Sequence, residues 1–250
     1  MKVILLGIFS AFFILGQTAE TELLSYLNKN LSVYKGGKYG YNMAISIFQT
    51  HDSKKPLEIM KINYQTWDNA YYLQQGNTET MLNQKYAVMV DYEEKEMYVQ
   101  KIAKGALKNY NSLKMDFKQI IDLELMKEQG VKVYDAGESG DEIKFLAIYK
   151  NHESIDKAQY SFSKSSGLIK GLIIYYKTNM LTLFGLDIPG YTPNPEFSGK
   201  PRLQIVYNQF GEIHTLPKTK LDELNYFNLV KGKMVPTEKF KSYRLINLIK

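Results

Sequence analysis

The residues whose types could support catalysis do not complete any known catalytic motif. Gly137-Glu138-Ser139 begins like the G-x-S-x-G turn that exposes the nucleophilic serine of hydrolases, but Asp141 stands where the second glycine is required. Gly199-Lys200 ends like a phosphate-binding loop, but Pro201 replaces the Ser or Thr that would contact Mg²⁺, and Asn194 replaces the upstream glycine. Neither stretch therefore predicts nucleophilic or phosphate chemistry.

Histidines and carboxylates also lack the spacing of a site. His51, His152 and His214 are widely separated, lie near turn-like residues and show no metal-ligand spacing, which favours solvated side chains. Asp91 should point away from Val90, into solvent. We expect no catalytic residue, no metal site and no cofactor, and the protein is predicted not to be an enzyme. An enzyme with an unrecognised site remains the weaker alternative.

The charge and the aromatic content describe the surface and the core. The formal net charge of the 250 residues is +6, carried mostly by Lys, with Arg202 and Arg244 as the arginines. Nucleic-acid readers usually cluster Arg, so we expect no nucleic-acid partner, while a weak preference for anionic lipid headgroups is compatible with the excess. The 20 Tyr and 10 Met residues fit either a filled sheet core or a cavity for acyl chains.

The N-terminal segment has the pattern of an export signal. Residues 3–16 carry no charge and follow Lys2, and this run is short for a membrane-spanning helix but suits the core of a signal peptide. We predict a signal at 1–16, cleaved before Gln17 or as late as Ala19, and one domain over 17–250. The chain has no Cys, so it cannot be lipidated on a mature N-terminal Cys. We expect a periplasmic protein.

Periodicity predicts an antiparallel sheet with two helices. Spacings of mostly three and four predict an amphipathic helix over 21–34, and its apolar positions are Leu23, Leu24, Leu27, Leu31 and Tyr34. A second helix is predicted over 115–129. Strands are predicted at 39–49, 57–67, 71–75, 78–82, 86–92, 96–101, 131–135, 142–150, 157–163, 167–177 and 201–208, with a last strand within 237–248. The fold class is α+β, a curled antiparallel sheet, or incomplete barrel, whose concave face the helices cover.

A long segment between Leu183 and Lys200 combines three Pro, three Gly and three aromatic residues. It could be a crossover packed on the sheet edge, or a functional lid or docking loop that uses Tyr191 and Phe197.

The order of these elements resembles a known family. A first amphipathic helix, a long alternating strand over 39–49, a second strand ending at Trp67 and the hairpin QKYAVMVDYEEKEMYV together look like the periplasmic lipoprotein-carrier, or LolA-like, family. The resemblance implies a half-barrel with a helical lid over an apolar cavity, and transport of acylated lipoproteins between membranes. One departure is that residues 39–67 contain no Arg, which the carriers use on an early strand to hold the lid.

The resemblance and the missing catalytic motifs lead to one functional hypothesis and one alternative. The protein is expected to bind or carry an acyl chain, a lipid or a lipoprotein, with an outer-membrane or envelope protein as a further partner. The expected lid residues are Leu24, Leu27 and Leu31, and the expected cavity wall consists of Tyr41, Met43, Ile45, Ile47, Met60, Ile62, Tyr64, Val88 and Val90. The alternative is a structural or interaction subunit of an envelope assembly, with a filled core.

Overall fold

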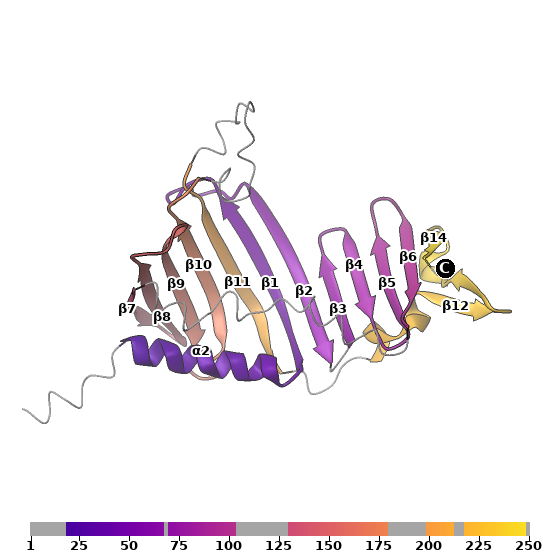
Figure 1. The fold of residues 1–250 in the computed structure, drawn as a ribbon, viewed down its shortest axis with the longest axis horizontal. Helices are drawn as coiled ribbons and strands as arrows, with labels where there is room; N and C mark the ends of the chain where they lie inside the picture. The colour runs from indigo at the N-terminus through magenta and orange to yellow at the C-terminus, as the bar shows by residue number, and fades with distance from the viewer. Residues whose placement is uncertain (1–18, 68–69, 104–129, 180–198, 213–217, 249–250) are drawn as a thin grey trace, which may run out of the picture.

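The computed structural model describes residues 19–67, 70–103, 130–179, 199–212 and 218–248 (Figure 1). The signal peptide at 1–16, the helix over 115–129, the loop residues Tyr191 and Phe197, and His214 all lie outside the described residues. These features therefore stay predictions.

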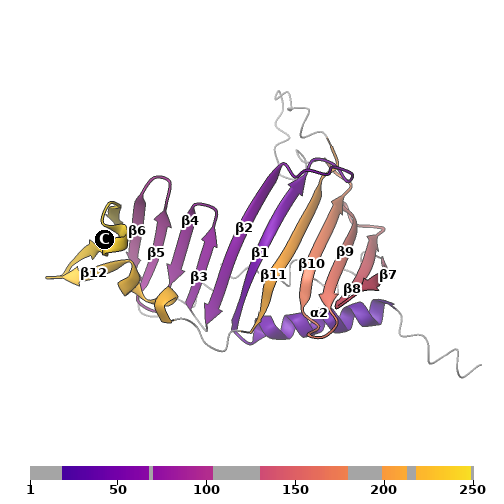
Figure 2. The ribbon, with the colours of Figure 1, turned by 180° about the vertical axis from the view of Figure 1, so that it is seen from behind.

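A twelve-stranded sheet forms the body of the protein, in the order β14-β6-β5-β4-β3-β2-β1-β11-β10-β9-β8-β7. Neighbouring strands are antiparallel except β14 and β6, which run parallel. The sheet curls, and among the described strands β14 and β7 lie at its two edges without closing into a barrel (Figures 1 and 2), which confirms the predicted open half-barrel. Its strands are β1 (Lys38–Phe48), β2 (Glu58–Trp67), β3 (Ala70–Gln75), β4 (Thr78–Leu82), β5 (Tyr86–Asp91), β6 (Glu96–Lys101), β7 (Val131–Ser139), β8 (Glu142–Tyr149), β9 (Ile155–Ser163), β10 (Ile169–Tyr176), β11 (Arg202–Glu212) and β14 (Arg244–Asn247).

Helix α2 (Ala19–Lys35) crosses one face of the sheet near one end of the strands β7 to β1 (Figure 1). Acidic residues in its first turn and Lys35 in its last turn suit the helix dipole. The helix stops at Gly36, and Gly37 adopts a φ of 72°, which glycine tolerates best. Its buried apolar residues, Leu23, Leu27 and Val33, join the core cluster of the sheet face that we call the helix face.

The apolar surface of the sheet changes sides between β2 and β5. Residues directly opposite each other in antiparallel strands share a face, so the register can be followed from strand to strand. On the helix face this path runs through Tyr64, Leu73, Thr80 and Met89, and on the opposite face through Gln65, Tyr72, Met81 and Val88. Met89 is exposed and Val88 is fully buried. The core of β4, β5 and β6 therefore lies on the side opposite α2, which we call the C-terminal face.

The C-terminal segment covers that second core. It contains the short 3-10 helices η3 (Lys218–Leu221), η4 (Glu223–Asn225) and η5 (Glu238–Phe240), and the hairpin of β12 (Phe227–Val230) and β13 (Lys233–Pro236). Tyr226, Phe227 and Phe240 pack on the apolar side chains of β4, β5 and β6, which include Val88, Val90, Met97 and Val99. The predicted hairpin pairing is confirmed, because Val88 faces Val99 and Val90 faces Met97.

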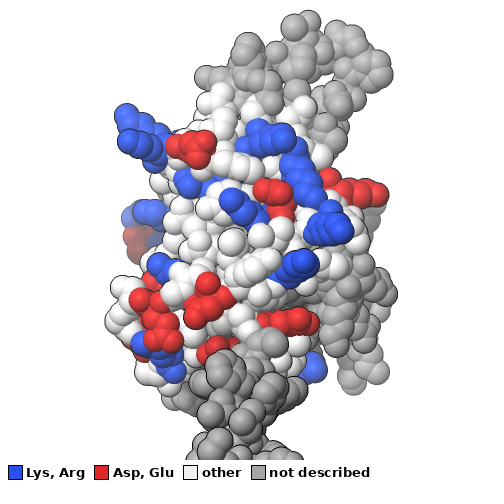
Figure 3. Space-filling view, turned by 90° about the vertical axis from the view of Figure 1, so that its left-hand side faces the viewer, with Lys and Arg blue, Asp and Glu red and all other residues white. Residues whose placement is uncertain are grey.

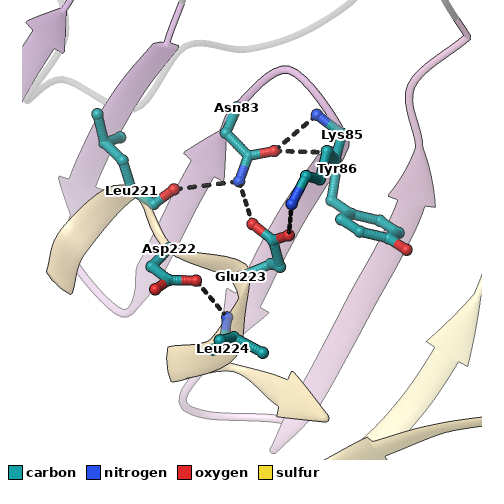
Figure 4. Close-up of polar contacts among 7 residues, drawn as sticks. All are labelled: Asn83, Lys85, Tyr86, Leu221, Asp222, Glu223 and Leu224. Carbon is teal, nitrogen blue, oxygen red and sulfur yellow. Dashed lines mark hydrogen bonds and ion pairs between the residues drawn. The ribbon is translucent and has the colours of Figure 1, made fainter. Parts of the chain in front are cut away.

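A polar cluster fixes this segment to the turn between β4 and β5 (Figure 4). The Asn83 amide donates to the Leu221 carbonyl at 3.1 Å and to the Glu223 carboxylate at 2.7 Å. Glu223 also forms an ion pair with Lys85 at 2.9 Å. Asp222 caps η4 by accepting a hydrogen bond from the Leu224 N–H.

No described helix is long and apolar enough to cross a membrane.

Candidate functional site

The helix face gathers seven of the nine predicted cavity-wall residues. Strand β1 alternates its apolar side chains toward this face, and its partners in β2 and β11 continue each row. The rows are Tyr41 with Tyr64 and Phe210, Met43 with Ile62 and Tyr207, Ile45 with Met60 and Ile205, and Ile47 with Leu203. Tyr41, Met43, Ile62 and Tyr64 are buried, whereas Ile45, Ile47 and Met60 are half-buried.

Val88 and Val90 do not belong to that wall, which corrects the predicted set. Both side chains are fully buried, but on the C-terminal face, under Tyr226, Phe227 and Phe240. The physical reason is the side-chain period of two: the register pairs Val88 with Met81 and, through β3, with Gln65 of β2, the neighbour of Tyr64. These two valines stabilise the attachment of the C-terminal segment.

The side of α2 that faces the sheet only partly matches the expected lid residues Leu24, Leu27 and Leu31. Leu27 is buried as expected, while Leu24 and Leu31 are half-buried and Leu23, Asn30 and Val33 take the inner positions. Asn30 is fully buried. Its amide nitrogen donates to the Gly167 carbonyl at 3.0 Å, and its amide oxygen accepts from the Ile169 N–H at 2.9 Å. This residue attaches α2 to the turn between β9 and β10, a role that sequence spacing alone did not reveal.

The two ends of the helix face differ in residue type: one end is aromatic and the other is aliphatic. Near α2, the rings of Tyr34 and Tyr39 lie 4.4 Å apart, and those of Tyr41 and Tyr64 stack at 5.1 Å. Burial raises the pKa of Tyr41 and of Tyr207 well above the usual value for a phenol, so both stay neutral. Farther along the strands lies what we call the aliphatic strip: Ile45, Ile47, Met60, Ile174 and Leu203, all half-buried.

The arginine of β11 contacts the neighbouring strand and the turn beside it. Arg202 pairs with Phe48 in the register, and its guanidinium lies 4.0 Å from the centre of the Phe48 ring. Its terminal Nη2 atom donates to the Ser53 carbonyl at 3.0 Å. These contacts place Arg202 in the role of stabilising the turn between β1 and β2. The position of α2 on the sheet depends on apolar packing and on the hydrogen bonds of Asn30.

The side chains that could support catalysis form hydrogen bonds that stabilise turns. Asp141 accepts hydrogen bonds from the Ser163 hydroxyl at 2.7 Å and the Ser165 N–H at 2.8 Å, and these lower the pKa of its carboxyl group. His152 accepts from the N–H groups of Ser154 and Ile155 through its Nδ1 atom. His51 contacts the Tyr176 carbonyl at 2.9 Å. Over the described ranges, no group of three or more His, Asp or Glu side chains could hold a metal ion.

A buried carboxylate that the sequence did not single out lies on the C-terminal face. Glu79 is 7% exposed and accepts hydrogen bonds from the phenols of Tyr226 at 2.6 Å and Tyr92 at 2.5 Å. A pocket of about 480 Å³ lies beside it, with Tyr72, Lys220 and Lys239 in its wall. The alternation of Glu79 with Met81 along β4 could have indicated an inward carboxylate, but the partner tyrosines are remote in sequence.

The surface at the β7 end of the sheet shows mixed charge. Figure 3 views this end and shows Lys and Arg side chains interspersed with Asp and Glu around an uncharged area. Lys164 pairs with Glu138 at 2.8 Å and Lys170 with Asp141 at 3.1 Å. This view shows no continuous basic surface of the kind that tracks a phosphate backbone.

Comparisons with known proteins give structural similarities without a sequence match. No family model matches the chain, and no curated protein matches it. One similar solved structure is an uncharacterized conserved protein from Thermus thermophilus, with 8% identity and a TM-score of 0.37 over 91% of this chain and 98% of that chain. A second is the lipoprotein LppX of Mycobacterium tuberculosis, with 10% identity and a TM-score of 0.41 over 78% of this chain and 98% of that chain. A third is a LolA superfamily protein from Nitrosomonas europaea, with 8% identity and a TM-score of 0.28 over 80% of this chain and 98% of that chain. The similar solved structures thus include a protein described as a member of the LolA superfamily.

Proposed function

We propose that this protein is a non-enzymatic binding or carrier protein that holds an acyl chain, a lipid or the acyl part of a lipoprotein on its helix face. The observation that supports this most directly is the aliphatic strip, which continues the core beyond the stacked tyrosines near α2. Its members come from four strands, β1, β2, β10 and β11, that are neighbours in the sheet.

The chemistry of the strip fits an acyl chain. Each methylene group that leaves water contributes about 0.8 kcal/mol, and branched aliphatic and Met side chains adapt to a flexible chain without directional contacts. Ile45 lies opposite Met60 and Ile205, and Ile47 lies opposite Leu203, so the apolar rows are continuous across the strands. Glu58, opposite Ile47 in β2, is exposed at the end of the strip, where a polar head group would meet solvent.

The location and the partners follow from the sequence and belong to the same proposal. The uncharged run at residues 3–16 supports export to the periplasm, followed by folding of 17–250 as one half-barrel domain. The expected partners are the acylated ligand and an outer-membrane or envelope protein that delivers or receives it. The turn roles of Asp141, His51 and His152 favour binding over catalysis.

The deciding experiment is mass spectrometry of lipids extracted from the protein after purification from periplasm without detergent. We expect an acyl species at a stoichiometric amount, and uptake of a fluorescent fatty acid by the delipidated protein. A protein that carries no lipid and also takes up no fatty acid would overturn the proposal. It would favour the alternative, a filled-core subunit of an envelope assembly.

A further inference from the structure

The hairpin of β12 and β13 projects from the β6 end of the sheet in both ribbon views (Figures 1 and 2). Phe227 pairs with Pro236 at its base and Val230 with Lys233 at its tip. The two turn residues, Lys231 and Gly232, have φ angles of 51° and 78°, the conformation of the tight two-residue turns that match strand twist. The tip is therefore a short, defined structure.

Apolar side chains are exposed on both sides of this hairpin. Leu229 is 56% exposed and shares its side with the buried Phe227, whereas Val230 and Val235, at 52% and 44%, occupy the other side. A flat protein partner would cover one side of the ribbon only. A medium that surrounds the tip, such as the interface of a lipid bilayer, would remove all three side chains from water.

The charge of the hairpin selects the kind of lipid surface. Lys231 lies in the turn and Lys233 directly follows it, and both are exposed. Residues 226–237 contain no Asp or Glu. Among the described residues, neither lysine forms an ion pair, in contrast to Lys85 and Lys241, which pair with Glu223 and Glu238. Basic residues next to exposed aliphatic ones fit an anionic membrane surface, since each Lys gains attraction to anionic head groups.

We propose that the tip of the β12–β13 hairpin, residues 229–235, inserts into the head-group region of anionic membranes. Leu229, Val230 and Val235 enter the acyl boundary, and Lys231 and Lys233 contact lipid phosphates. This is a membrane-contact site separate from the acyl-binding strip, which lies on β1, β2, β10 and β11, so each proposal can fail without the other.

The electrostatic part of this proposal is tested by sedimentation of the purified protein, residues 17–250, with lipid vesicles. We expect binding to phosphatidylcholine vesicles that contain phosphatidylglycerol to be roughly tenfold or more tighter than to phosphatidylcholine alone, and to weaken with salt. Lys231→Gln with Lys233→Gln should remove most of this preference. The matched control is Lys54→Gln with Lys55→Gln, the same change of charge in the β1–β2 turn, close in sequence to the exposed Leu57 and Ile59. Equal loss in both double variants would overturn the proposal.

Insertion is tested with a fluorescent reporter. In a Trp67→Phe background, Leu229→Trp should shift its emission to shorter wavelength on addition of the anionic vesicles, while Leu57→Trp in the same background should not. Vesicle binding without a shift at position 229 would place the contact elsewhere and overturn the proposal. Fatty-acid uptake, measured on the same hairpin variants, should equal that of the wild type, which separates this site from the proposed acyl site.

Discussion

The phenol oxygen of Tyr226 lies 2.6 Å from a carboxylate oxygen of Glu79, a contact between residues 147 positions apart in the sequence. Tyr92 donates to the other oxygen of the same carboxylate at 2.5 Å. Burial, followed by the hydrogen bond to Glu79, raises the pKa of Tyr226 far above its usual value, so its phenol remains a donor. This buried polar contact joins the C-terminal segment to strand β4.

Tyr226→Phe should lower the free energy of unfolding by about 1.5–3 kcal/mol, the range for a hydrogen bond to a charged group. Urea denaturation measures this directly. The matched control is Tyr98→Phe, whose phenol donates to the Glu96 carboxylate nearer to solvent and should therefore contribute less to stability than Tyr226 does. Equal losses in the two variants would show that burial of Glu79 does not strengthen the contact.

Asn30→Ala should destabilise the attachment of α2. The change leaves the Gly167 carbonyl and the Ile169 N–H without their side-chain partner in a buried place, which costs about 1–3 kcal/mol. We expect faster amide hydrogen exchange along α2 and a lower unfolding temperature. Asn28→Ala is the control, since Asn28 is exposed on the same helix. Unchanged exchange in Asn30→Ala would mean that apolar packing alone positions α2.

Ile45→Asp should weaken fatty-acid binding at least about tenfold, which corresponds to ~1.4 kcal/mol, because a charge in the aliphatic strip opposes burial of the chain. Titration with a fluorescent fatty acid measures the affinity. Ser46→Asp is the matched control, because the neighbouring residue points to the other face of the same strand. If Ile45→Asp lowers the unfolding temperature strongly, the milder Ile45→Ser replaces it. Wild-type affinity in a folded Ile45 variant would contradict the assignment of the strip.

The turn at His152 should make stability depend on pH. Burial, with a smaller effect of Lys177, lowers the pKa of His152 below its usual value, and its Nδ1 must be unprotonated to accept the two backbone N–H groups. The unfolded chain therefore binds a proton at a higher pH than the folded one. This contribution to stability is complete above the usual His pKa of about 6.5 and is lost as the pH falls toward the lowered value.

His152→Asn keeps an acceptor and removes the titration. We expect the unfolding temperature of the wild type to fall more between pH 7 and pH 5 than that of His152→Asn, measured by differential scanning fluorimetry. Parallel curves for the two proteins would show that His152 does not couple to folding.

Sequence periodicity was enough to predict most of the sheet. Strand β4 occupies the predicted residues 78–82, and β5 and β6 form the predicted hairpin with Val88 opposite Val99. The reason is that alternation of apolar and polar residues is a local property, which a strand shows wherever it lies. The prediction missed the hairpin of β12 and β13, where exposed Leu229, Val230 and Val235 break the alternation.

Which residues share a face was decided by the tertiary structure. In β3, Tyr71 and Leu73 point to the helix face and Tyr72 to the other, so both sides of this strand are apolar and its sequence does not show on which side the core continues. Only the register across β2, β3, β4 and β5 shows that Val88 and Tyr64 lie on different faces of the sheet. The cover of that second core, Tyr226, Phe227 and Phe240, comes from far along the chain.

The sequence by itself thus determined the first helix and most of the strands of the large sheet, because these depend on neighbouring residues. The tertiary structure decided that Asn30 holds α2 to the β9–β10 turn, that β14 pairs parallel with β6, and that the apolar core moves from one side of the sheet to the other. Each of these depends on contacts between distant segments, whose free energy depends on the geometry of the whole sheet.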